Sequence, residues 1–132
     1  MSECRLIRGG GGFRGRQGLD YFAGISAEST GATGICMHLL EMPPGARARP
    51  HYHEAHETAI FVLEGTAEMR HGPGLEQVMR IEAGDFVYIP PGVPHQPHNP
   101  TDRLVRAVIA RTDPNEQESV VLLPELDRLV KE

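Results

Sequence analysis

Three histidines and two glutamates fall within residues 51–57, which read HYHEAHE. His51 and His53 are two positions apart, and on an extended segment that spacing places both imidazoles on one face. Two imidazoles on one face can bind the same metal ion. An apolar run at residues 59–63 follows directly and has the composition of a buried strand. A polar cluster at this place is a poor way to build a core, and it predicts a metal site.

A second histidine segment lies about forty residues further on, at residues 90–99, which read PPGVPHQPHN. Prolines on both sides of His95 fix its backbone, so little conformational entropy remains to be lost on binding. His95 therefore suits the role of a third ligand from a neighbouring strand. His98 is either a solvated loop residue or an acid–base group at the mouth of the same site.

Short apolar segments separated by glycine and proline must position these residues. The expected strands are 35–42, 59–63, 77–81, 86–89 and 104–110, with one further short strand at 19–25. This spacing is typical of an all-β sandwich or barrel. After Pro124, apolar residues at 126, 129 and 130 follow an i, i+3, i+4 pattern, which predicts a short C-terminal helix.

Length and composition limit the classes of protein that this chain can represent. The 132 residues correspond to one domain, and the net charge of −5 argues against binding to nucleic acid. No apolar run is long enough to cross a membrane, and residues 1–5 begin no signal peptide, so we expect a cytoplasmic protein. Two cysteines, Cys4 and Cys36, are too few for the disulfide framework of a secreted domain.

The spacing of glycines, prolines and histidines resembles the two motifs of the cupin superfamily. The residues that resemble the first motif are Gly45, His51, His53 and Gly65. The residues that match the second motif at every position are Gly84, Pro90, Gly92, His95 and Asn99. The resemblance implies a cupin double-sheet barrel (a jelly-roll β-sandwich) with one divalent metal ion in its mouth. We expect a glycine-rich N-terminal arm at 1–34 and a single cupin domain at 35–132.

The first motif departs from the family pattern at one position. Cupins usually supply a glutamate five residues after the second histidine, and here that position is Thr58. If the strand is regular, His56 and Thr58 share a face with Ile60, while Glu57 points the other way. His56 would then complete a four-histidine site with His51, His53 and His95. A β-bulge would instead bring Glu57 to the metal.

The ligand set and the expected pocket walls bear on the metal and the substrate. Imidazole suits zinc, iron or nickel, whereas a carboxylate in the set favours iron or manganese. We expect Zn²⁺, with Fe²⁺, Mn²⁺ or Ni²⁺ as alternatives. The apolar residues expected to line the pocket are Ile35, Met37, Leu39, Ile60, Val62, Met69, Met79, Phe86 and Val108. Such a pocket suits a hydrophobic substrate with oxygen donors.

Among cupins, the chain resembles small bacterial monocupins that act as aromatic polyketide cyclases of resistomycin-type biosynthesis. The likeness rests on the single domain, the histidine-rich first motif without its glutamate, and the closing segment at residues 110–116. It implies a homodimer that binds a polyketide-like small molecule and catalyses aldol-type cyclisation and aromatisation of a poly-β-keto intermediate. The base would be a metal-bound hydroxide, His98 or Glu57. The alternatives are a non-haem iron dioxygenase acting on an aromatic or diketone substrate, and a non-catalytic ligand-binding cupin.

Overall fold

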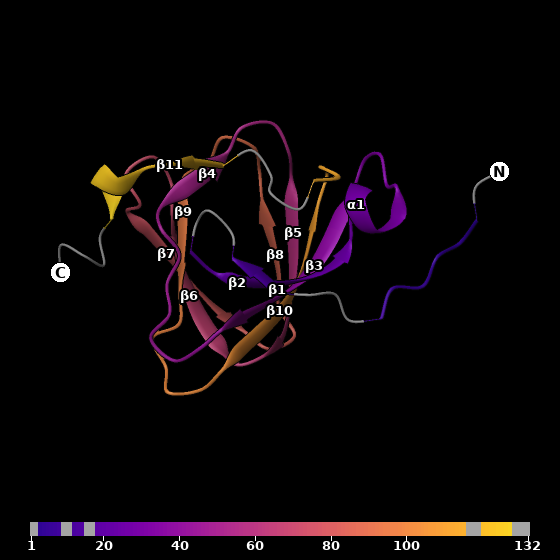
Figure 1. The fold of residues 1–132 in the computed structure, drawn as a ribbon. Helices are drawn as coiled ribbons and strands as arrows, with labels where there is room; N and C mark the ends of the chain where they lie inside the picture. Colours follow the sequence, from indigo (N-terminus) through magenta and orange to yellow (C-terminus); the bar gives the residue numbers. More distant parts are fainter. Residues whose placement is uncertain (1–2, 9–11, 15–17, 116–119, 128–132) are drawn as a thin grey trace.

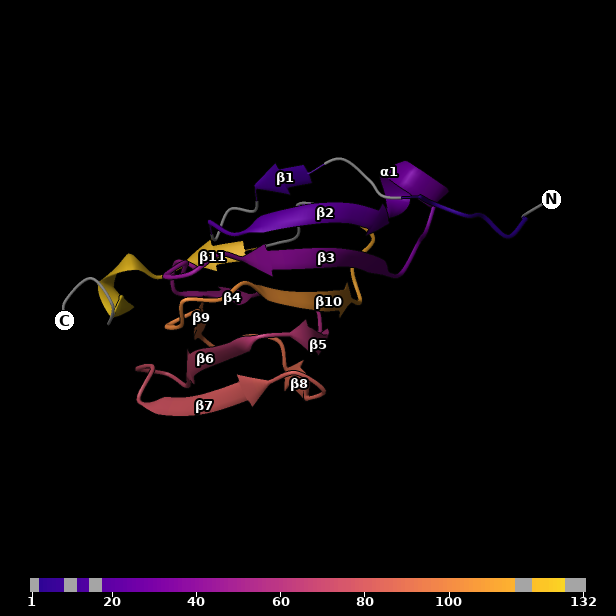
Figure 2. The ribbon, with the colours of Figure 1, turned by 90° about the horizontal axis from the view of Figure 1, so that it is seen from below.

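Two antiparallel β-sheets face each other in the computed structural model, which describes residues 3–8, 12–14, 18–115 and 120–127 (Figure 1, Figure 2). The chain is mostly strand, with few helical residues in the part that is described. The expected all-β fold of two packed sheets is therefore confirmed. None of the described helices is long and apolar enough to span a membrane.

Each sheet mixes strands from distant parts of the chain. The first sheet contains, in spatial order, β1 (Gly12–Arg14), β2 (Asp20–Ile25), β3 (Cys36–Met42), β10 (Val105–Arg111), β5 (Thr58–Glu64) and β8 (Phe86–Ile89). The second contains β11 (Val120–Leu122), β4 (His51–His53), β9 (His95–His98), β6 (Thr66–His71) and β7 (Gln77–Glu82). Both histidine segments thus belong to neighbouring strands of the second sheet, β4 and β9.

Alternating burial along β10 shows which face of the first sheet points inward. Val105, Ala107, Ile109 and Arg111 are buried, and the residues between them are partly exposed. A period of two is expected for an antiparallel sheet that has one face on the core and one toward water. The inner faces of the two sheets therefore enclose the core and the space in front of the histidines.

The chain crosses from the first sheet to the second at Gly65, between β5 and β6. Gly65 has a φ of +87°, in the left-handed region that favours glycine. A Cβ at this position would lie 2.5 Å from the carbonyl oxygen of Leu104 and 2.9 Å from the Cα of Val105. The crossing therefore requires glycine for both its backbone conformation and its close approach.

The strands predicted from apolar runs correspond to β2, β3, β5, β7, β8 and β10, within one residue at each end. Strands β1, β4, β6, β9 and β11 were not predicted as strands. Three of them, β4, β6 and β9, carry histidines or other polar residues that hide the apolar alternation. Strand β2 pairs with β3 from Asp20↔Glu41 to Ile25↔Met37, so this part of the glycine-rich arm extends the first sheet.

The short C-terminal helix that the sequence predicts is not shown as an α-helix in the described residues. Pro124–Leu126 forms one 3-10 turn, η1, and Asp127 that follows is extended, with φ −67° and ψ 94°. Three apolar residues at helical spacing are too few to favour an α-helix without tertiary packing, and η1 buries none of its residues. The positions 128–130 of that prediction lie outside the described residues. A four-residue helix at Ala27–Thr30, α1, was not predicted and begins with a capping box at Ser26.

Candidate metal centre

The structure brings His51, His53 and His95 together on the inner side of the second sheet. His51 and His53 stand two positions apart on the extended strand β4, and β9 pairs with β4 where His51 faces His95. Each of the three side chains is 2% exposed. One ring nitrogen from each lies within 4.8 Å of the others, which is a spacing that a single metal ion can bridge.

Backbone carbonyls fix the orientation of two of these rings. His51 Nδ1 lies 2.6 Å from the carbonyl oxygen of Arg49, and His95 Nδ1 lies 3.0 Å from that of Val93. Because a carbonyl oxygen only accepts, Nδ1 donates in both cases, and Nε2 of the neutral ring keeps its lone pair. A second-shell acceptor of this kind is typical of metal-binding histidines.

Burial also holds the histidines in their neutral form. Desolvation is the main cause that lowers the pKa of His95 to about 4, and it also holds the pKa values of His51 and His53 well below their ordinary value. The positive charge of Arg111 lowers all three pKa values as well. Neutral imidazole is the form that binds a metal ion, so the chemistry of this donor set fits a divalent cation.

His56 lies beside the three-histidine group. Its ring centroid is 4.7 Å from that of His53, and its side chain is 3% exposed. His56 Nδ1 lies 3.6 Å from a carboxylate oxygen of Asp113. His56 does not belong to the group of mutually close ligand atoms found in the described residues, which contains His51, His53 and His95.

The structure does not bring Glu57 or His98 to the histidine group. Glu57 is exposed on the outer surface, where its carboxylate accepts a 2.7 Å hydrogen bond from the Tyr88 hydroxyl. That bond raises the pKa of Tyr88. His98 stands three residues past His95 on β9, and it does not line the cavity that His95 and Pro97 line. Strand alternation explains this, because His98 has the opposite parity to both.

A cavity lies between the sheets in front of the histidines, and most of its wall is apolar. Thr58, Ile60 and Val62 line it together, as the regular strand before Gly65 predicts. The apolar lining residues are Leu19, Leu40, Met42, Ile60, Val62, Ala67, Met69, Ile81, Ile89, Pro97, Val105, Ala107 and Ile109. Its volume of about 60 Å³ holds roughly four to six water-sized groups.

Several residues that the sequence placed in the pocket lie elsewhere. Ile35, Met37 and Phe86 are exposed, and Leu39 and Val108 line a separate hollow beside Arg5–Ile7. In β3 and β10 the error is one position, since Leu40, Met42, Ala107 and Ile109 line the cavity instead. A one-residue slip moves every side chain of a strand to the other face.

Arg111 is a cavity residue that the sequence did not identify. It is 4% exposed and lines the cavity, with its guanidinium carbon 5.5 Å from the centroid of the Tyr21 ring. The signal lay in β10, where Val105, Ala107, Ile109 and Arg111 occupy alternate positions. Arginine is rarely fully buried unless it is paired. An arginine at an inward-facing position of an otherwise apolar strand therefore indicates a candidate functional residue.

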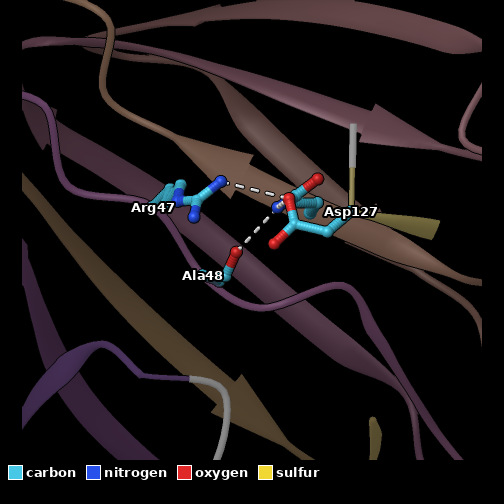
Figure 3. Close-up of polar contacts among 4 residues, drawn as sticks. Arg47, Ala48 and Asp127 are labelled. Carbon is cyan, nitrogen blue, oxygen red and sulfur yellow. Dashed lines mark hydrogen bonds and ion pairs between the residues drawn. The ribbon is translucent and has the colours of Figure 1, made fainter. Parts of the chain in front are cut away.

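Hydrogen bonds on the other face of β9 connect the two ligand segments. Gln96 Nε2 donates to the carbonyl oxygen of Ala48 at 3.0 Å and to Asp127 Oδ1 at 2.9 Å. Arg47 Nη1 donates to the same carboxylate oxygen at 3.1 Å (Figure 3). Ala48 N also donates to the carbonyl oxygen of Pro97. The chain before His51 is therefore held against the strand that carries His95.

The chain belongs to the cupin family, because the family model described as Cupin domain matches residues 38–110, more than half of the chain. The matched segment contains both histidine segments and the three clustered histidines. No curated protein matches the chain.

Solved cupin structures share the fold. Oxalate decarboxylase of Lactobacillus farciminis in a formate complex is 18% identical, with a TM-score of 0.71, and the match covers 92% of this chain and 35% of that one. A Bacillus subtilis oxalate decarboxylase structure concerned with its Mn(II) centres is 19% identical, with a TM-score of 0.69, covering 80% and 28%. The Cnp3 cupin domain of Schizosaccharomyces pombe is 18% identical, with a TM-score of 0.60, covering 72% and 64%. The chain thus spans about a third or less of the length of the oxalate decarboxylases, and these identities show the fold alone.

Proposed function

We propose that the protein is a metal-dependent cupin enzyme that activates a carbonyl group of a largely apolar, oxygen-bearing substrate. The particular reaction that we propose is aldol-type cyclisation of a poly-β-keto intermediate. The observation that carries the proposal is the buried group of three neutral imidazoles, His51, His53 and His95, at the wall of a mainly apolar cavity.

The three histidines would hold the metal ion, and we propose Zn²⁺ because the chain resembles polyketide cyclases in its histidine-rich first motif without the usual glutamate. Imidazole ligands leave the full charge of the ion in place, so a bound divalent cation would supply Lewis acidity that polarises a carbonyl oxygen. We propose His56 as a fourth ligand, because its buried ring adjoins His53 and Asp113 lies close to its Nδ1. The other ring nitrogen would then be the donor to the metal.

The chain's other residues would orient the substrate and exclude water. The apolar wall formed by residues such as Ile60, Val62 and Ile109 favours a hydrocarbon part of the substrate over water. A cavity of about 60 Å³ holds only the reacting end of a polyketide, so the rest would extend beyond it. We do not propose His98 or Glu57 as the base, since neither lines the cavity.

The experiment is metal analysis of the purified protein together with turnover of a poly-β-keto substrate. We expect one equivalent of zinc, cyclisation without oxygen uptake, and loss of both metal and turnover in His95→Ala. The matched control is His98→Ala, which removes the other histidine of β9 and should keep both. Bound iron with oxygen consumption would contradict the cyclase and support a dioxygenase. Ligand binding that survives metal loss, with no turnover of any substrate, would support a non-catalytic binding protein.

A further inference from the structure

Two polar residues stand side by side on the cavity wall contributed by the first sheet. The register of β5 and β10 places Thr58 directly opposite Arg111. Such partners on antiparallel strands have Cβ atoms about 4.5–5.5 Å apart. Both side chains are buried, at 2% and 4% exposure, and both line the cavity that the three histidines line.

The guanidinium of Arg111 places a fixed positive charge inside this cavity. It lies over the Tyr21 ring, and Tyr21 is another cavity residue. Arginine stays protonated even when buried, and its planar fork matches the two oxygens of a carboxylate. The part of the wall around Arg111 therefore favours an anionic group, while Glu68 lines the cavity from β6 of the second sheet.

The hydroxyl of Thr58 adds a hydrogen-bonding group at the same place. Thr58 Oγ1 is buried and has no hydrogen-bond partner in the part of the chain that the structure describes. A buried hydroxyl without a partner carries a desolvation cost, which a ligand oxygen would remove. Thr58 occupies the position where cupins usually have glutamate, so a neutral donor here replaces a negative charge that would repel an anion.

We propose that Arg111 and Thr58 form an oxyanion subsite on the first-sheet wall of the cavity, which holds a carboxylate or enolate oxygen of the substrate. The small cavity limits this group to about the size of a 1,3-dicarbonyl unit. The inference deepens the proposed function, on which it rests for the bound metal. It restricts the substrate to compounds that carry a negative oxygen next to the activated carbonyl.

The test is calorimetric titration of the zinc-loaded full chain with three small compounds of equal size. Acetoacetate carries a carboxylate, acetoacetamide is its neutral counterpart, and acetylacetone carries an anion only as its enolate. We expect acetoacetate to bind more tightly than acetoacetamide if the subsite takes carboxylates. Binding of acetylacetone with the ultraviolet absorbance of its enolate identifies an enolate subsite. Equal, weak binding of all three compounds would overturn the proposal.

Substitutions distinguish the contribution of the subsite to anion binding from that of the metal ion. The charge of the metal ion favours anions equally in every zinc-loaded variant. Arg111→Met should weaken binding of the anion by about 10- to 100-fold and reduce its advantage over acetoacetamide by the same factor. Thr58→Val should weaken anion binding about 2- to 10-fold, and Thr58→Ser should restore it. Unchanged anion binding in folded, zinc-loaded Arg111→Met would overturn the proposal.

Arg106→Met is the matched control, because it removes the same charge from the same strand. Arg106 Nε lies 3.2 Å from a carboxylate oxygen of Glu41, Arg106 Nη1 lies 3.7 Å from one of Glu64, and Arg106 does not line the cavity. Its anion binding should stay within about 2-fold of the parent protein, since exposed ion pairs contribute little.

If Arg111→Met does not fold, Arg111→Lys replaces it, because lysine keeps the positive charge and lacks the planar guanidinium. Wild-type anion affinity in both Arg111→Lys and Thr58→Val would then overturn the proposed subsite. Zinc content and circular dichroism of each variant check the metal and the fold. Anion binding that depends on Arg111 in a protein without cyclase turnover would leave the subsite standing and count against the proposed reaction only.

Discussion

Two of the three clustered histidines, His51 and His95, are oriented by backbone carbonyl oxygens. The carbonyl oxygens of Arg49 and Val93 set the tautomers of His51 and His95, so that Nε2 is the available nitrogen in both rings. Burial keeps the rings neutral. The three-histidine site is therefore preformed, because its ligands need neither a proton transfer nor a large rearrangement before they bind a cation.

His56 offers a test of the ligand number at this scale. If His56 is the fourth ligand, His56→Ala should lower zinc affinity by about 10- to 100-fold and keep the stoichiometry, because the three clustered histidines remain. Competition with a chromophoric chelator measures the change. Asp113→Asn should give a smaller loss in the same direction, because Asp113 faces Nδ1 of His56. An unchanged affinity in His56→Ala would limit the set to three histidines.

The sequence was sufficient to predict the three histidines but not which side chains line the cavity, and the reason is physical. His51, His53 and His95 were identifiable because strand periodicity and flanking prolines act locally. The cavity placement of Arg111 and the exposure of Phe86 depend on which face of a strand meets the second sheet. That face is decided by pairing between strands far apart in the sequence, such as β10 with β3 and β5. Apolar runs locate a strand but leave its parity open when both faces carry apolar residues.

At the level of elements, the connections between strands matter as much as the strands. Strands β4 and β9 are short and share one residue pair, His51↔His95. Contacts outside the ladder therefore hold them in register: the backbone bond from Ala48 to Pro97 and the side-chain bonds of Gln96. The polar composition of these strands hid them from prediction, and it is also what lets them carry the site.

The carboxylate of Asp127 joins these elements, and its removal should be measurable. Asp127→Ala deletes the acceptor of both Gln96 and Arg47, and we expect the free energy of unfolding to fall by about 1–2 kcal/mol. Urea denaturation measures the change. The control is Glu82→Ala, which breaks an exposed ion pair with Arg80 and should cost less than about 0.5 kcal/mol. Equal losses in the two variants would contradict a structural role for Asp127.

The crossing at Gly65 permits a sharper test. Gly65→Ala should destabilise the fold by roughly 3 kcal/mol or more, because the backbone strain adds to the clash of the new Cβ with Leu104 and Val105. Gly45→Ala is the matched control, since Gly45 also has positive φ, at +76°, but nothing lies within 4 Å of its Cβ position. It should cost only about 1 kcal/mol, from the backbone term alone. Thermal unfolding of the two variants separates the contributions, and similar losses would show that the close approach is unimportant.

At the scale of the whole molecule, the two sheets shield a group of titratable residues from water. One largely apolar space between the sheets is lined by the polar residues Tyr21, His51, His53, Thr58, Glu68, His95 and Arg111. Several wall strands of this space are hydrogen-bonded to neighbours that are distant in the sequence, such as β4 to β9 and β10 to β3 and β5. The stability of the molecule is thereby coupled to the protonation of its own site.

This coupling predicts a loss of stability in mild acid for the metal-free protein. The pKa of His95 is about 4 in the folded chain and about 6.5 when unfolded, and those of His51 and His53 are also lowered. Below pH 6.5 the unfolded state therefore binds more protons, so the unfolding free energy falls as pH falls. Each histidine contributes a slope of up to about 1.4 kcal/mol per pH unit, which for His95 ends near pH 4.

Urea denaturation of chelator-treated protein between pH 7.5 and pH 4 measures that slope, and none is expected from these groups above about pH 7. His95→Asn should reduce the slope, because it removes one buried imidazole, whereas His98→Asn, outside the cavity, should leave most of it. Saturating zinc should raise stability near neutral pH and steepen its loss in acid, since protons then compete with the metal for the same nitrogens. A metal-free protein equally stable at pH 7 and pH 5 would show that the three histidines are not buried in neutral form, and the preformed site would have to be abandoned.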